Sequence, residues 1–175
     1  MKTLVAYSSR TGNTKKVAEA IYEVMPEDAE IASVEDVKCL DKYDFIAIGC
    51  WIDKGTADKK ALEFIEKVKN KNVAIFITLG AYPDSQHARE SMDRIKKLLE
   101  KENNIVGEFI CQGKIDPKLI EKFKSLPPDH PHALNPERIK RHKEAAKHPN
   151  EEDFKKAKKI FKNIIENLES TVCSQ

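Results

Sequence analysis

The sequence predicts an α/β fold, a doubly wound five-stranded parallel sheet with helices on both faces and an extended helical C-terminal tail. Short apolar runs alternate with amphipathic helical patterns through the first two thirds of the chain. Most of these runs are nearly continuously apolar, as strands covered on both faces must be. The chain has 175 residues, 40% of them hydrophobic, enough for one domain with a sizeable core. We therefore expect a single domain over residues 1–175.

Four segments have the composition of buried strands. They are rich in Val, Ile or Phe and occupy residues 3–8, 44–50, 73–80 and 105–113. A weaker run at residues 29–34 alternates between apolar and polar side chains, which is typical of an edge strand. Together these runs account for five strands.

Three helices are expected between the strands, because apolar residues recur there at helical spacing. Their predicted buried faces are Val17, Ile21, Val24 and Met25; Leu62, Phe64, Ile65 and Val68; and Met92, Ile95, Leu98 and Leu99. This alternation of strand and helix at short spacing indicates parallel strands joined by crossover helices.

The C-terminal tail has a different composition. Residues 125–136 hold four prolines and no periodic pattern, which predicts a stiff extended connector. Asn135-Pro136 has the form of a helix start, so residues 126–150 are expected to be a Pro-rich connector with a short helix. A last helix is expected at 151–169, packing on the sheet through Phe154, Ala157, Phe161, Ile164 and Leu168. The tail is then an elaboration of the same domain.

Charge and cysteine content narrow the class of protein. Net charge is +2, and residues 113–175 carry an excess of +4, from 14 Lys and Arg against 10 Asp and Glu. Acidic residues interleave the basic ones, which favours solvated helix faces over a nucleic-acid site. Four scattered cysteines without a CxxC pair indicate reduced thiols. No signal peptide and no 18-residue apolar segment is present, so we expect a cytoplasmic protein without membrane insertion.

The topology predicts where a ligand would bind. Ligands of doubly wound sheets bind outside the carboxyl ends of the strands, where the strand order reverses. This rule selects the loops at residues 8–14, 50–58 and 80–87.

The first of these loops has the chemistry of a phosphate site. Residues 8–14, SSRTGNT, follow an apolar run and open a helical pattern. Backbone N–H groups at a helix start, short hydroxyl donors and Gly12 together suit a phosphate group. The triphosphate motif GxxxxGK[ST] and the dinucleotide motif GxGxxG are both absent. An ordinary capped helix start is the alternative, although one hydroxyl would suffice for a cap.

The stretch VAYSSRTGNTKKVAEAI resembles the flavodoxin signature, an apolar strand followed by [ST]-x-x-G-x-T and a helix. The resemblance implies the flavodoxin-like strand order 2-1-3-4-5 and the cofactor FMN. It places six residues around the FMN 5′-phosphate: Ser9, Arg10, Thr11, Gly12, Asn13 and Thr14. Arg10 departs from the neutral donors usual in flavodoxins, and either binds the phosphate or points to solvent.

The resemblance assigns the flavin ring to the other two loops. Trp51, Ile52, Asp53, Lys54 and Gly55 follow the third strand. Trp51 is a stacking candidate, and the backbone at 53–56 is the candidate partner of the flavin N5–H. In flavodoxins, however, Trp directly precedes Gly in this loop, whereas in this chain three residues separate Trp51 from Gly55.

The loop after the next strand contributes Gly80, Ala81, Tyr82 and Asp84. Gly80 and Ala81 would offer backbone N–H groups to the flavin O2 and N1. Tyr82 is either a second stacking wall or a turn residue ahead of Pro83.

The function expected from this resemblance is that of a low-potential electron carrier between a reductase and a partner oxidoreductase. No nucleophile or acid–base constellation is apparent, so no catalytic residue is assigned. The alternative is an NAD(P)H-dependent flavin or quinone reductase on the same fold. The long tail also resembles the BilS type of long-tailed flavodoxins of anaerobic bacteria, some of which are associated with bilirubin reduction.

Two further alternatives concern other classes of protein. His130, His132, His142 and His148 suggest a metal-binding module, but no cysteine is spaced to join them, so no metal is assigned. A response-regulator receiver would need paired acidic residues after the first strand, where this chain reads Ser-Ser-Arg. We expect redox partner proteins, no nucleic acid and a monomer.

Overall fold

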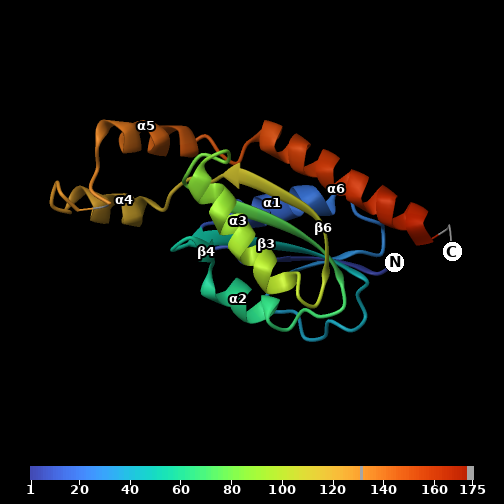
Figure 1. Ribbon diagram of the computed structural model, residues 1–175. Coiled ribbons are helices and arrows are strands. Elements are labelled where there is room, and N and C mark those ends of the chain that lie inside the picture. The colour runs from blue at the N-terminus through green and yellow to red at the C-terminus, as the bar shows by residue number, and fades with distance from the viewer. Residues whose placement is uncertain (131, 173–175) are drawn as a thin grey trace.

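A parallel sheet with helices on both faces forms the body of the protein (Figure 1). The computed structural model describes residues 1–130 and 132–172. The strands are β1 (Thr3–Tyr7), β2 (Glu30–Ser33), β3 (Phe45–Asp53), β4 (Thr56–Ala57), β5 (Asn72–Leu79) and β6 (Asn104–Gln112). The helices are α1 (Asn13–Tyr22), α2 (Lys59–Ile65), α3 (Gln86–Leu99), α4 (Pro117–Lys124), α5 (Pro136–Ala145) and α6 (Glu151–Val172).

The strand order is β2-β1-β3-β5-β6, and all neighbours in this series are parallel. With the five predicted strands numbered along the chain, this is the expected order 2-1-3-4-5. The small strand β4 was not predicted. It pairs antiparallel with the end of β3, making a six-stranded sheet.

The predicted loop at 50–58 is therefore wrong in its boundaries, because β3 continues to Asp53 and returns as β4. Lys54 and Gly55 link the two strands with φ of 50° and 79°. Two consecutive residues with positive φ form the tight turn that matches the twist of a β-hairpin. The hairpin replaces a flexible loop at this edge of the sheet.

Successive side chains of each strand enter opposite layers, as strand geometry requires. Leu4, Ile46 and Ile75 pack with α2 and α3 on one face. Val5 and Phe76 pack with α1 and α6 on the other. Both faces are buried, which explains why the strands appear as continuous apolar runs in the sequence.

The last helix packs on the sheet as expected, but it extends beyond the predicted residue 169 to Val172. Its Phe161 is fully buried and meets Phe76 of β5 edge to face, with ring centroids 5.9 Å apart. Asn135 caps α5 and Pro136 lies in its first turn, which confirms the predicted helix start.

The segment between β6 and α6 differs from the stiff extended connector that was predicted. It begins with helix α4, capped by Asp116, and turns follow in which His130 N–H donates to the Pro127 carbonyl at 2.9 Å. Pro131, one of the four prolines on which that prediction rested, lies outside the described residues. Figure 1 shows α4 and α5 projecting past the carboxyl ends of the strands. We call residues 114–148 the arm.

Candidate functional site

A cavity of about 470 Å³ lies at the carboxyl edge of the sheet, within the range of about 300–1,000 Å³ usual for ligand sites. The three loops line one side of it and the arm lines the other. Its lining comprises Ser9, Arg10, Thr11, Asn13, Thr14, Trp51, Ile52, Thr78, Leu79, Gly80, Ala81, Tyr82, Ser85, His87, Gly113, Lys114, Ile115, Asp116, Leu119, Phe123, His132, Arg138, Arg141 and His142. The cavity thus lies where the topology rule predicts a ligand, and the arm enlarges it.

The first loop is shaped by a local turn ahead of α1. Ser9 Oγ accepts a hydrogen bond from the Gly12 N–H at 3.1 Å. Gly12 has φ 93°, a left-handed conformation that side chains disfavour. The first N–H groups of α1 are free of intrahelical partners, which leaves donors for an anion. Gly12 itself does not line the cavity, so its part is to set the backbone.

Replacing Gly12 with alanine is expected to destabilise the protein by about 1–2 kcal/mol, the cost of a side chain in left-handed backbone. An added Cβ would meet no atom within 4 Å, so backbone strain alone is tested. Urea unfolding measures the change. Gly12→Asn should be milder, because asparagine tolerates this conformation. Equal stability of wild type and Gly12→Ala would contradict the strain.

Two buried threonines meet beneath the first loop. Thr14 Oγ1 lies 2.9 Å from Thr78 Oγ1, and both residues line the cavity. Either hydroxyl can donate in this pair. When Thr78 donates, the Thr14 hydroxyl proton is free for a ligand. Thr78 was missed in the sequence, since nothing in β5 distinguishes it from a structural strand residue.

A buried carboxylate, that of Asp58, forms a hydrogen bond to the first loop. Ser8 Oγ donates to Asp58 Oδ1 at 2.6 Å, and the same oxygen accepts from the Ala61 N–H at 3.4 Å, capping α2. Asp58 is only 3% exposed, so this contact connects the first loop to the start of α2 in a water-poor setting. Asp58 thereby positions the loop without lining the cavity.

Arg10 contacts one residue of β3 and one residue of the arm. Its Nη2 is 3.3 Å from Asp116 Oδ2, and its guanidinium stands 5.7 Å from the ring centroid of Trp51. Both contacts engage the Arg10 guanidinium with the protein, and the side chain remains 55% exposed to solvent. Asn13 Nδ2 donates to the Lys114 carbonyl at 2.8 Å, joining the first loop to the arm.

The hairpin after β3 contributes only its first part to the cavity. Trp51 and Ile52 line it, whereas Asp53, Lys54 and Gly55 do not. The Gly55 carbonyl instead accepts a hydrogen bond from Arg94 Nη1 at 2.7 Å. The 53–55 turn therefore lies outside the cavity, and this hydrogen bond connects it to α3.

The loop after β5 brings three of its four predicted residues to the cavity. Gly80, Ala81 and Tyr82 line it, and Asp84 is exposed outside it. Ser85 caps α3 by accepting from the Ala88 N–H at 3.2 Å, while its hydroxyl donates to the Tyr82 carbonyl at 2.6 Å. This double contact fixes Tyr82 at the cavity wall.

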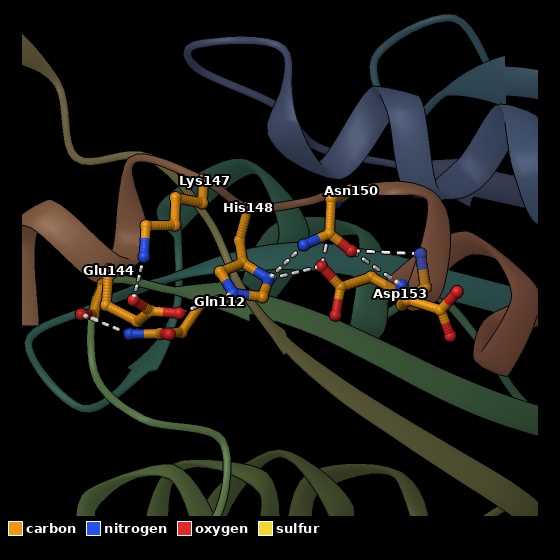
Figure 2. Close-up of polar contacts among 8 residues, drawn as sticks. Gln112, Glu144, Lys147, His148, Asn150 and Asp153 are labelled. Atoms are coloured by element: carbon orange, nitrogen blue, oxygen red, sulfur yellow. Dashed lines mark hydrogen bonds and ion pairs between the residues drawn. The ribbon is translucent and has the colours of Figure 1, made fainter.

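The first and last residues of the arm lie next to each other, close to the end of β6. The Lys114 N–H donates to the His148 carbonyl at 2.9 Å. Figure 2 shows His148 between two acidic residues, with Nδ1 2.5 Å from Asp153 Oδ2 and Nε2 3.6 Å from Glu144 Oε1. Lys147 lowers the pKa of the Glu144 carboxyl through a hydrogen bond and its charge. These contacts connect the end of α5 to the start of α6 and anchor the arm.

Neither the histidines nor the thiols form a metal site in the part of the chain that the structure describes, where no three His, Cys, Asp or Glu are suitably grouped. His132 and His142 line the cavity instead, and His148 makes the contacts that connect the end of the arm to α6. Cys50 and Cys111 are free thiols, and burial raises the pKa of both. Cys173, included in the sequence-based prediction of reduced thiols, lies outside the described residues.

Much of the cavity was not predicted from the sequence. The segment 113–116 also ends a strand at the carboxyl edge, so the topology rule could have included it. The arm residues Phe123, His132, Arg138, Arg141 and His142 gave no signal, because their role depends on how the arm folds back.

No helix among residues 1–130 and 132–172 has the length and apolar content needed to cross a bilayer.

Comparison with known proteins assigns the family. A model of the flavodoxin domain matches residues 4–162. A flavodoxin-like domain-containing protein BilS of Clostridioides difficile (strain CD3) is 37% identical over 172 residues, which cover 94% of this chain and 97% of the relative.

Solved structures share the fold. The structure of a flavodoxin from the domain Archaea has a TM-score of 0.63 at 20% identity, covering 97% of this chain and 99% of that one. A flavoprotein from Lactobacillus acidophilus NCFM, solved in complex with FMN, has a TM-score of 0.52 at 19% identity, covering 69% and 97%. Together with the hydroxyl-rich turn at the carboxyl edge, these matches show that the chain belongs to the flavodoxin domain family.

Proposed function

We propose that this protein binds FMN in the cavity and carries electrons at low potential between a reductase and a partner oxidoreductase. The observation that carries the proposal is the turn at Ser9–Thr14, whose hydroxyls and helix N-terminus open into a cavity of ligand size. Membership of the flavodoxin family and the FMN bound in the Lactobacillus acidophilus relative support the choice of cofactor.

The residues present fit such a cofactor. A phosphate would meet the Ser9, Thr11 and Thr14 hydroxyls and the first N–H groups of α1, all neutral donors. The cavity lining contains a single carboxylate, Asp116, and Arg10 pairs with it, so no unpaired negative charge opposes an anion among the described residues. The second threonine, Thr78, supports the donor role of Thr14.

The ring would be held by the other two loops. Trp51, Ile52 and Tyr82 would offer apolar surface against its faces, and Gly80 and Ala81 would offer backbone N–H groups at its edge. Bound FMN supplies the redox chemistry, and the protein provides the binding, the orientation and the electrostatics. These side chains exclude water, and an apolar setting disfavours added negative charge, which is the basis for a low potential.

The second candidate function is that of a reductase or an accessory flavoprotein. The similarity to BilS over nearly the whole of both chains favours it, since the tail that resembles the BilS type builds part of the cavity. Under this alternative the protein would pass electrons to a small molecule, or would assist bilirubin reduction. The cytoplasmic location and monomeric state expected from the sequence remain parts of the leading proposal.

We expect the purified protein to bind FMN and not FAD, because the first loop supplies one phosphate site and the sequence contains no second phosphate motif. Acid release of the flavin followed by chromatography identifies the cofactor. Recovery of mainly FAD, or no flavin after reconstitution, would refute the proposal. Steady NADPH oxidation by the FMN-loaded protein alone would establish the reductase alternative over the electron carrier.

A further inference from the structure

The arm presents two cations to the cavity without neutralising them. Arg138 and Arg141 lie three positions apart on α5, on one side of that helix, and both line the cavity. Neither guanidinium forms an ion pair with a carboxylate within 4.0 Å in the described part of the chain. Several exposed lysines elsewhere in the protein, in contrast, form ion pairs with glutamates. A positive end of the cavity results.

Arg141 has an unsatisfied hydrogen-bond donor among the described residues. Its Nε is buried, and the Nε–H donates to no acceptor among the described residues. Arg138 donates from Nη1 to the Ala133 carbonyl at 2.8 Å, which fixes its direction. Burial lowers the pKa of His142, and the charges of Arg141 and Arg138 lower it further. A buried donor without a partner is costly, so a ligand anion there would be favourable.

Flat side chains accompany the two arginines. The Phe123 ring stacks on His132 with centroids 5.8 Å apart and an interplanar angle of 20°. His142 lies on α5 with its ring 6.1 Å from Phe123, tilted by 34°. All three line the cavity, so the arm offers planar apolar surface beside its cations. This combination suits a planar molecule that carries a negative group.

The phosphate of the proposed cofactor does not account for these groups, because the first loop already supplies its donors. We propose that the arm forms a second ligand subsite, specific for a small planar conjugated anion held by Arg138 and Arg141 beside the flavin site. The position beside a flavin rests on the function proposed above. The recognition of a planar anion rests on the arm alone.

The test uses 2-naphthoate as the probe and 2-naphthamide as its uncharged analogue, titrated calorimetrically into the full-length protein with and without FMN. We expect 2-naphthoate to bind and 2-naphthamide to bind at least about tenfold more weakly, as loss of a charged hydrogen-bond partner implies. Arg141→Gln should weaken 2-naphthoate by about tenfold or more and leave 2-naphthamide unchanged. Arg141 Nε has no hydrogen-bond partner among the described residues, so the substitution breaks no hydrogen bond at that atom.

Lys140→Gln is the matched control, since Lys140 is an exposed neighbour on the same helix and its loss changes net charge equally. It should leave both probes unaffected, and thermal unfolding should show the same stability for both variants. Equal binding of the two probes, or equal effects of the two substitutions, would overturn the subsite.

A different result would assign the arginines to the cofactor. If Arg141→Gln weakens FMN but not riboflavin, and leaves 2-naphthoate unchanged, the guanidinium binds the FMN phosphate and the subsite is refuted. If the protein binds no FMN but still binds 2-naphthoate through Arg141, the subsite holds and the proposed function fails. The two inferences are therefore tested separately.

Discussion

Replacing Phe161 with alanine is expected to lower the free energy of unfolding by about 3–5 kcal/mol, the usual cost of removing a buried phenylalanine. Phe161 is fully buried in α6, and its ring meets that of Phe76 at an interplanar angle of 88°. Both the transfer of the ring from water and its edge-to-face contact would be lost. Urea unfolding followed by circular dichroism measures the change.

The same experiment tests the expectation that residues 1–175 form a single domain. If α6 belongs to the cooperative unit, the variant should unfold in one transition at a lower urea concentration. Lys159→Ala is the control on the same helix, because Lys159 is exposed and should change stability by no more than about 0.5 kcal/mol. A separate early transition confined to helix signal would show that α6 unfolds independently.

Replacing Thr14 with valine is expected to weaken FMN binding by about 1–3 kcal/mol, the range for losing a hydrogen bond to a charged group. Valine keeps the shape of threonine and removes the hydroxyl that we propose donates to the phosphate. Riboflavin has no phosphate, so its affinity should change little. Quenching of flavin fluorescence during titration of the apoprotein measures both dissociation constants.

Two further substitutions make this result specific. Thr78→Val should weaken FMN by a smaller amount, because Thr78 is proposed to act only by donating to Thr14 Oγ1 at 2.9 Å, which keeps the Thr14 proton free, and the two effects should be non-additive. Thr3→Val is the matched control, since Thr3 is a fully buried threonine at the opposite end of β1 whose Oγ1 has no partner in the described chain. Equal losses of FMN and riboflavin in Thr14→Val would exclude a phosphate role.

The sequence predicted the sheet well and the tail incompletely. The buried strands were visible because covering both faces leaves few polar positions, as in Phe45–Cys50. Helix α4 was missed, since eight residues make about two turns and give too little periodicity to recognise. None of its residues is fully buried in the structure.

The sequence by itself determined the order of strands and helices and the chemistry of the turn at residues 8–14. Both are local properties, since periodicity and a hydroxyl-rich helix start are written in contiguous residues. Only the tertiary structure decided which distant residues complete the site. Thr14 meets Thr78 across 64 positions, and Arg10 meets Asp116, because the carboxyl ends of the parallel strands lie at one edge of the sheet. The arm reaches the cavity for a similar reason, since the Lys114–His148 hydrogen bond folds it back on that edge, and no local pattern specifies a contact over such a separation.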